Sequence, residues 1–211
     1  MEALWRNQLA GQLPQTDIAL ASAQIDLLVR YLALLDKWNR TFNLTAVRDP
    51  REMVGRHLVD SLSVLPCLAG RRLLDVGSGA GLPGIPIAIA RPDLEVTLLD
   101  SNSKKTRFLA QVSLELNLAN VSVVHSRVER YRASQPFDTA VSRAFASLRD
   151  FWRKTQHLVG ADGRLVAMKG RPPRTELDEI GKGGGVCCEL VVIAESPAPE
   201  RTLVVMRRCP S

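Results

Sequence analysis

The feature that most constrains the fold is the segment 73–86, where a short apolar run passes into a stretch dense in glycine. The run Leu73 to Val76 is typical of a buried strand, and four glycines follow it before an apolar helical pattern begins. Glycine lets a backbone turn at positive φ and approach a ligand closely. This order of strand, glycine turn and helix predicts a ligand-binding loop at the carboxyl end of a strand in an α/β sheet.

The remainder of the chain after residue 70 supports an α/β sheet, because short β-rich runs alternate with helical stretches. These runs cover 72–76, 96–100, 121–125, 139–142 and 165–169. Strands that alternate with helices predict parallel pairing with right-handed crossovers. The last two runs, 189–194 and 202–207, have only a Ser-Pro-Ala-Pro connector between them and predict an antiparallel hairpin. We therefore expect a mostly parallel seven-stranded sheet with an antiparallel terminal hairpin.

The first 65 residues have a different pattern, with apolar positions at helical spacing from Ile25 to Leu35 and Ser22 as a candidate N-cap. A second helix is predicted from Arg51 to Leu65, and the polar segment 39–50 between the two is predicted as a loop. We expect residues 1–66 to form a helical extension packed on a core of residues 67–211, in one compact unit.

Composition excludes several classes of protein. With 211 residues, 45% apolar and 24% charged, the chain is neither disordered nor collagen-like. It has no apolar run of roughly 18 residues to cross a membrane, and Met1 to Ala10 lacks the apolar region of a signal peptide, so a cytoplasmic protein is expected. Four irregularly spaced cysteines predict reduced thiols, and three scattered histidines predict no metal site.

The net charge of +6 and the isoelectric point near 9.5 fit a partner that carries phosphate groups. The excess of positive charge lies after residue 70. Because many basic proteins bind no nucleic acid, charge alone leaves the partner open.

The glycine loop by itself leaves two cofactor classes open, because Gly79, Gly81 and Gly84 also satisfy the G-x-G-x-x-G pattern of dinucleotide-binding loops. In either case Asp100, at the end of the next predicted strand, is placed to accept hydrogen bonds from ribose hydroxyls. A tight turn with no ligand is the remaining alternative.

Three observations favour S-adenosylmethionine over a nicotinamide dinucleotide. Asp75 directly precedes the glycines, where a carboxylate can orient the loop or accept from an amino group but would repel a pyrophosphate. Neither Tyr31 nor Tyr131 is followed four residues later by lysine, so the Tyr-x-x-x-Lys pair of short-chain dehydrogenases is absent. Finally, the architecture with its terminal hairpin resembles the Rossmann-like fold of class I methyltransferases.

A more specific resemblance extends over about residues 25 to 207. The chain resembles the bacterial 16S rRNA guanine-N7 methyltransferases, the RsmG or GidB family. The motifs that carry the resemblance are Tyr31–Asn39, Asn43–Ala46, Arg56–Leu62, Asp75–Pro86, Ser126–Glu129, Phe137–Ala146, Met168–Gly170 and Pro199–Leu203. The Asn-Leu-Thr and His-x-x-Asp-Ser-Leu segments are the most specific, because they lie outside the general cofactor fold.

The resemblance implies methyl transfer from S-adenosylmethionine to N7 of one guanine in the 530 loop of 16S rRNA, with S-adenosylhomocysteine as product. It implies 16S rRNA or the small ribosomal subunit as partner, and we expect a monomer. By the resemblance, Gly77 and Leu82 contact the cofactor, Val128 and Glu129 lie at its adenine end, and Arg143 lies near the transferring methyl as the catalytic residue. With these, the predicted cofactor site comprises Asp75, Gly77, Gly79, Gly81, Leu82, Asp100, Val128, Glu129 and Arg143.

The residue inventory suits this chemistry. Guanine N7 has a free lone pair at neutral pH, so no general base is needed and rate comes from positioning and electrostatics. The segment Val141 to Ala144 is not the Asn-Pro-Pro-Tyr type that methylates amino groups, and no cysteine stands there to attack a pyrimidine.

Basic residues after the predicted strands are candidates for RNA contact, because ligands bind at the carboxyl ends of strands in open α/β sheets. The candidates are Lys104, Lys105, Arg107, Arg127, Lys169, Arg171, Arg174 and Arg201. The family motifs favour Lys169, Arg171 and Arg201. A solvated basic face is the alternative for each of them.

His57, Asp60 and Ser61 share one helical face. With no proton to remove, we expect His57 to have a structural or cofactor-lid role, with a hydrogen bond within its helix or to the loop 43–45. The segment Gly181 to Cys188 is richer in glycine and cysteine than the family leads us to expect. Two other functions stay open: a class I methyltransferase for a small molecule or protein, and a non-catalytic RNA-binding chaperone of ribosome assembly.

Overall fold

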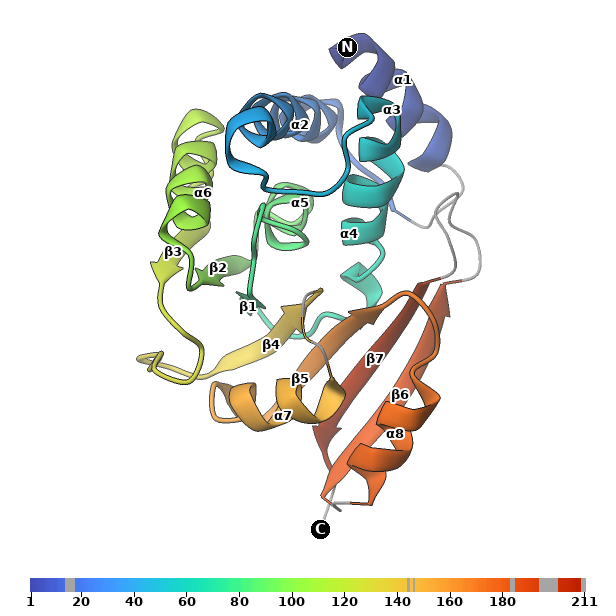
Figure 1. Cartoon of the computed structure of the whole chain (residues 1–211), viewed down its shortest axis with the longest axis vertical. Helices are drawn as coiled ribbons and strands as arrows, with labels where there is room; N and C mark the ends of the chain where they lie inside the picture. The colour runs from blue at the N-terminus through green and yellow to red at the C-terminus, as the bar shows by residue number, and fades with distance from the viewer. Residues whose placement is uncertain (14–17, 144, 146, 183–184, 194–200, 210–211) are drawn as a thin grey trace.

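The computed structural model describes residues 1–13, 18–143, 145, 147–182, 185–193 and 201–209, and its centre is a seven-stranded sheet (Figure 1). The strands are β1 (Arg72–Val76), β2 (Glu95–Asp100), β3 (Val121–His125), β4 (Phe137–Ser142), β5 (Val159–Lys169), β6 (Val186–Ile193) and β7 (Arg201–Arg208). Their order in the sheet is β3-β2-β1-β4-β5-β7-β6. Only β7 is antiparallel to both of its neighbours, and the other pairs are parallel. The expected α/β sheet with a terminal antiparallel hairpin is confirmed.

Helices cover both faces of the sheet. They are α1 (Glu2–Gln12), α2 (Ser22–Phe42), α3 (Pro50–Met53), α4 (Asp60–Leu62), α5 (Gly84–Ala90), α6 (Ser103–Glu115), α7 (Leu148–Thr155) and α8 (Arg174–Gly181). In Figure 1, α7 and α8 lie on one side of the sheet, and the N-terminal helices with α5 and α6 lie on the other. Two clusters of buried apolar side chains fill these two interfaces. None of the helices among the described residues is long and apolar enough to cross a membrane.

The N-terminal helices pack through the apolar face that the sequence predicted. Leu28, Leu32 and Leu35 of α2 are fully buried. The N-cap of α2 is Ala21, one residue before the predicted Ser22, because the Gln24 side chain reaches back and accepts a hydrogen bond from the Ala21 amide at 2.8 Å. Helix α1 is anchored by Trp5, whose indole donates a hydrogen bond to the Pro50 carbonyl at 2.8 Å.

The helix predicted over 51–65 is interrupted. Helix α3 passes into a π-helical turn, Val54–Val59, before α4, and a 3₁₀ turn follows at Leu65–Cys67. A π turn inserts one residue into the helical ladder and is frequent at functional sites. Here it carries His57, and Asp60 follows directly.

Strands β5 and β6 begin earlier than predicted. Strand β5 starts at Val159 rather than at residue 165, and its register shifts opposite Phe137 and Thr139. The run Gly160 to Gly163 contains two glycines and an aspartate, which are poor strand formers and hid this part of the strand. Strand β6 starts at Val186 and ends at Ile193, whereas the prediction was 189–194. The Ser-Pro-Ala-Pro connector at 196–199 lies outside the described residues.

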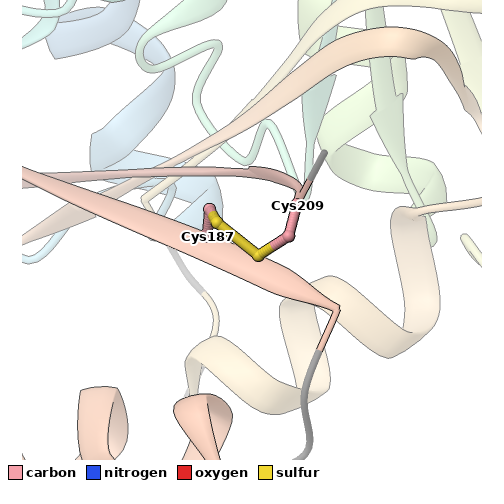
Figure 2. The surroundings of a disulfide bond; sticks show 2 residues. All are labelled: Cys187 and Cys209. Atoms are coloured by element: carbon pink, nitrogen blue, oxygen red, sulfur yellow. A yellow bond between two sulfur atoms is a disulfide. The ribbon is translucent and has the colours of Figure 1, made fainter. Parts of the chain in front are cut away.

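The prediction that all four cysteines are reduced thiols is wrong for two of them. Cys187 and Cys209 form a disulfide with their Cα atoms 5.1 Å apart (Figure 2). The cause is the register of the hairpin: Cys187 pairs with Arg207, so the end of β7 brings Cys209 alongside the start of β6. That proximity depends on strand pairing and not on cysteine spacing. Cys67 and Cys188 are free.

The packing of α1 yields a stability prediction. Trp5→Ala removes a side chain that is 2% exposed, together with its hydrogen bond to Pro50, so the free energy of unfolding should fall by about 3–5 kcal/mol. Urea denaturation followed by circular dichroism measures the change. The neighbouring Leu4→Ala, at a side chain 38% exposed, is the matched control and should cost less than about 1 kcal/mol. Equal effects of the two substitutions would show that α1 is not anchored through Trp5.

Candidate active site

A cleft of about 580 Å³ lies where β1, β4 and β5 end and the N-terminal loop approaches them. One wall is the glycine loop, and the opposite wall comes from the segment 44–47 and the π turn. The lining residues are Leu44–Val47, Arg56, His57, Gly77–Ala80, Leu82, Lys105, Arg143, Phe145, Met168–Gly170 and Arg201. The structure therefore brings the predicted Gly77, Gly79, Leu82, Arg143, Lys169 and Arg201 together.

The glycine loop is held by two carboxylates at the ends of adjacent strands. Asp75 Oδ2 accepts a hydrogen bond from the Gly84 amide at 3.0 Å, and Asp100 Oδ2 accepts one from the Gly79 amide at 2.8 Å. The amides of Gly77 and Ser78 donate to the Leu99 carbonyl at 2.8 and 3.1 Å. The loop is thus fixed to both β1 and β2 without any ligand contact.

The glycines of this loop meet different demands. At Gly79, where φ is +59°, a Cβ would meet no atom closer than 3.8 Å, so the backbone is open to the cleft. At Gly84 a Cβ would lie 2.7 Å from Asp75 Oδ2 and 2.3 Å from a methyl carbon of Leu98. Gly79 therefore keeps the loop accessible, and Gly84 allows the carboxylate of Asp75 to approach the helix α5.

Asp75 is fully buried, and burial raises its pKa to about 7. One carboxylate oxygen accepts from the Gly84 amide, and the other, Oδ1, has no hydrogen-bond partner within the described residues. The structure thus shows the loop-orienting contact, the first of the two roles considered for this residue. Gly81, at φ +90°, packs against Ile85 of α5 and also shapes the loop from behind.

Asp100 ends β2 as predicted, and it is 6% exposed. Both of its oxygens accept hydrogen bonds from backbone amides, Oδ2 from Gly79 and Oδ1 from Asn102 at 2.8 Å. The Lys105 ammonium lies 4.0 Å from Oδ2. Because a carboxylate oxygen has two acceptor sites, each can still accept a second hydrogen bond.

Val128 and Glu129 lie apart from the residues that line the cleft. Val128 packs against the apolar cluster beneath β4 and β5. Glu129 is exposed and its carboxylate pairs with Lys154 at 3.2 Å, in a second hollow of about 600 Å³ that Arg132, Arg153 and His157 also line.

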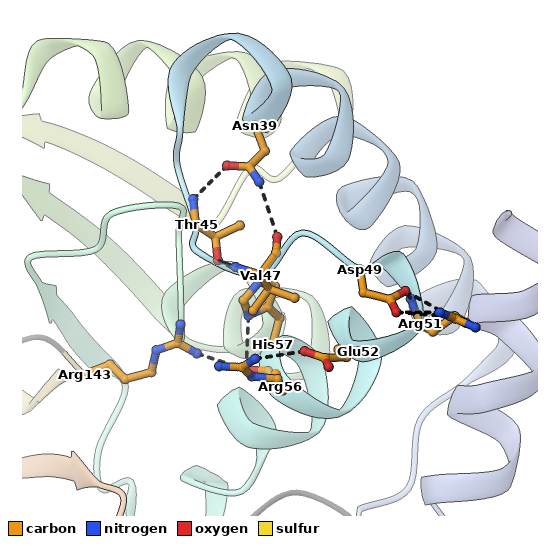
Figure 3. Close-up of polar contacts among 9 residues, drawn as sticks. All are labelled: Asn39, Thr45, Val47, Asp49, Arg51, Glu52, Arg56, His57 and Arg143. Carbon is orange, nitrogen blue, oxygen red and sulfur yellow. Dashed lines mark hydrogen bonds and ion pairs between the residues drawn. The ribbon is translucent and has the colours of Figure 1, made fainter.

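The second wall of the cleft depends on a short hydrogen-bond network (Figure 3). Asn39 at the end of α2 accepts from the Thr45 amide at 2.9 Å and donates to the Val47 carbonyl at 3.4 Å. The Thr45 hydroxyl lies 3.0 Å from His57 Nε2 and accepts from the Val47 amide at 3.2 Å. The segment 44–47 is therefore tied to both α2 and the π turn.

His57 is buried, and the geometry indicates its tautomer. Its Nδ1 lies 3.1 Å from the Arg56 carbonyl, which can only accept, so Nδ1 carries the proton and Nε2 accepts from the Thr45 hydroxyl. Burial, and next the nearby Arg143 charge, lower the pKa of His57 to about 4. The hydrogen bonds expected of His57, one within its helical turn and one to the loop, are both present.

Arg143 extends from the end of β4 toward the π turn. Its Nη1 donates to the Arg56 carbonyl at 3.2 Å (Figure 3). The same Nη1 donates to Asp60 Oδ2 at 3.0 Å. Arg201, at the start of β7, pairs with the same carboxylate: Nε lies 2.6 Å from Asp60 Oδ1. Burial raises the pKa of Asp60, and the two guanidinium groups oppose that effect.

The remaining predicted RNA contacts are divided between the cleft and the surface. Lys169 lines the cleft, but its side chain is only 14% exposed, and its ammonium pairs with the Glu176 carboxylate at 2.9 and 3.1 Å. Lys104, Arg127 and Arg171 are exposed.

Sequence reasoning missed two contributors to the site. The Tyr31 hydroxyl, fully buried, donates to the Ala80 carbonyl at 2.7 Å and so ties α2 to the glycine loop. Asp60 was considered only as a neighbour of His57. Both lie inside family motifs, yet no local pattern indicates contacts across 49 and 83 residues of sequence.

Comparison with known proteins gives consistent results. The model of the family described as rRNA small subunit methyltransferase G matches residues 24–194. A protein of that description from Pseudomonas paraeruginosa is 52% identical over 96% of this chain and 95% of its own length. One from Chromobacterium violaceum is 54% identical over 94% of this chain and 96% of its own length.

Among solved structures, the O-methyltransferase TomG from Streptomyces achromogenes, in complex with S-adenosylmethionine, superposes with a TM-score of 0.62. It is 14% identical, and the match covers 99% of each chain. The precorrin-6y C5,15-methyltransferase from Geobacter metallireducens matches with a TM-score of 0.57 and 14% identity, over 80% of this chain and 92% of its own. At these identities the likeness shows the class I methyltransferase fold.

The buried His57 makes a pH prediction. Its pKa is about 4 in the folded chain and 6.5 ordinarily, so the unfolded state binds the proton first and stability falls as pH drops from 6.5 toward 4. The stabilisation from His57 should decrease by about 2 kcal/mol between pH 7.5 and 5. Urea unfolding of the wild type and of His57→Gln at both pH values isolates this contribution as a difference. A difference that does not change with pH would show that His57 titrates normally.

Proposed function

Because the chain belongs to the rRNA small subunit methyltransferase G family, we propose that it transfers a methyl group from S-adenosylmethionine to N7 of one guanine in the 530 loop of 16S rRNA. The single observation that carries the proposal is the extent of the match. It includes the loop 43–47 and the His57 to Leu62 segment, which form the cleft wall opposite the glycine loop. A match confined to the glycine loop would support only the cofactor.

The residues present fit S-adenosylmethionine. The backbone at Gly79 is open to the cleft, the loop is rigid before any ligand binds, and Asp100 retains acceptor capacity beside it. Gly77, Gly79, Leu82 and Asp100 would hold the cofactor directly, while Asp75 and Gly81 shape the loop behind them. Val128 and Glu129 would serve the adenine end from the segment after β3.

The proposed reaction requires no general base from the protein. S-adenosylmethionine supplies an electrophilic methyl group on a sulfonium sulfur. Guanine N7 has a free lone pair and forms the new bond without losing a proton, so the neutral His57 is not needed as a base. The chain must align the acceptor with the methyl group and accommodate the positive charge that moves to the purine. Arg143 is the proposed catalytic residue, because it lies in the cleft between the two walls.

RNA would approach across the rim of the cleft. In an A-form helix N7 lies in a deep, narrow groove, so the target must be a loop or a displaced base. Arg201 inside the cleft and Arg171, Lys104 and Arg127 on the surface are the proposed phosphate contacts. Lys169 faces the cleft, but its pairing with Glu176 favours a role in fixing the end of β5.

Labelled S-adenosylmethionine tests the proposal directly. We expect the protein to label small subunits or 16S rRNA from cells that lack it, and borohydride with aniline to cut the product once, in the 530 loop. Binding of the cofactor without RNA labelling would instead indicate a small-molecule or protein methyltransferase. Binding of RNA without cofactor would indicate an assembly chaperone.

The role of Arg143 gives a further prediction. Arg143→Ala should lower the rate of methyl transfer by about 100-fold or more, because the acceptor loses its positioning group, while circular dichroism stays unchanged. Arg40→Ala, at a guanidinium 76% exposed on α2, is the matched control and should keep the wild-type rate. Normal turnover by Arg143→Ala would contradict the catalytic role proposed for Arg143.

A further inference from the structure

A buried carboxylate from the N-terminal segment lies between two arginines of the cleft. Asp60 is 1% exposed, and its oxygens are divided between the two: Oδ2 accepts from Arg143 Nη1 at 3.0 Å, and Oδ1 lies 2.6 Å from Arg201 Nε. The three residues come from α4, the end of β4 and the start of β7. The pair of contacts therefore joins three parts of the chain at one point.

Both arginines are only partly covered by protein. Their side chains are 29% and 22% exposed, and both line the cleft. Arg143 has a second anchor in the Arg56 carbonyl, which fixes the plane of its guanidinium group. The contacts of Arg143 with Asp60 and Arg56 use Nη1, the contact of Arg201 with Asp60 uses Nε, and both side chains keep exposed surface on the cleft, where their other N–H groups can meet a ligand.

The charges explain why a carboxylate is needed here. Two guanidinium groups without Asp60 would repel each other and would also oppose the positive charge that methyl transfer moves onto the purine. With Asp60 between them, the three groups carry a net charge of +1. The two arginines thus present directed N–H donors to the cleft, while the net positive charge of the group is lower than that of two unpaired arginines.

We propose that Asp60 is a positioning residue for methyl transfer, which holds Arg143 and Arg201 side by side so that the N–H groups they present to the cleft orient the target nucleotide. This inference rests on the proposed function. It gives the His-x-x-Asp segment of the N-terminal extension a part in methyl transfer. Asp60 would act by orienting the two arginines and not by contact with the cofactor. Misplacement of a positioning group by about 1 Å costs on the order of 100-fold in rate.

The first test is Asp60→Asn, which keeps the shape and removes the charge. Single-turnover methyl transfer at saturating S-adenosylmethionine should fall about 100-fold, far more than the dissociation constant for the cofactor changes when measured by calorimetry. Asp36→Asn, an aspartate of α2 that pairs with Arg40, is the matched control and should change neither quantity. A general loss of structure would weaken cofactor binding together with the rate.

A double-mutant cycle separates positioning from folding. In the Arg143→Ala variant Asp60 can act only through Arg201, so Asp60→Asn should slow this variant clearly less than the factor of about 100 by which it slows the wild type. If the rate losses of the two single variants multiply in the double variant, the proposal is overturned. A wild-type rate in Asp60→Asn would also overturn it.

Removing one partner of a buried ion pair can unfold a protein, so a second pair of variants keeps both charges. Arg143→Lys and Arg201→Lys retain the attraction to Asp60 but lose the planar fork that the carboxylate orients. We expect Arg143→Lys to be nearly as slow as Arg143→Ala and Arg201→Lys to be slower than the wild type. Full activity in both lysine variants would show that charge, and not orientation, is sufficient, and would overturn the proposal.

A readout independent of turnover is the NMR signal of the arginine side chains. In the wild type, rotation about the guanidinium bonds of Arg143 and Arg201 should be slow. In Asp60→Asn the rotation of both guanidinium groups should become fast. The lysine variants assign the signals, because each one removes the signal of the substituted arginine and leaves that of the other arginine unchanged. Fast rotation in the wild type would overturn the proposal. Failure of the wild type to label rRNA would instead contradict the proposed function.

Discussion

The hydrogen bond between the Asp75 carboxylate and the Gly84 amide is the contact on which the rest of the site depends. It ties the end of β1 to the start of α5, so the loop between them has a fixed shape before any ligand arrives. The cost is a fully buried carboxyl group whose pKa rises to about 7 and whose second oxygen has no partner in the part of the chain that the structure describes. A buried polar atom left without a partner costs free energy, and here the loop contact offsets that cost.

The N-terminal helices complete the site that the sheet begins. Tyr31 of α2 binds the glycine loop from one side, while Asn39 and His57 hold the segment 44–47 across the cleft from it. Both walls are thus fixed to α2, and the segment 44–47 is also fixed to the π turn. The extension therefore forms the cleft wall opposite the glycine loop.

Local patterns in the sequence predicted the sheet, its terminal hairpin and the glycine loop, because each depends on periodicity or on glycine and apolar residues close together in the chain. Local patterns did not predict features that depend on residues far apart in the sequence. The Cys187 to Cys209 disulfide follows from the register of β6 and β7, and the early start of β5 follows from pairing with β4. The Asp60 contacts likewise join residues 83 or more positions apart.

The electrostatics of the cleft suit a reaction that moves a positive charge without moving a proton. Burial keeps His57 neutral, and Asp60 offsets one of the two guanidinium charges beside it. A protonated histidine or two unpaired arginines at this wall would oppose a cation that forms on the acceptor. The same arrangement would hinder chemistry that needs a general base, since the imidazole nitrogen that could accept a proton is already bound to Thr45. The wall thus favours an acceptor atom that needs no deprotonation, such as an aromatic ring nitrogen with a free lone pair.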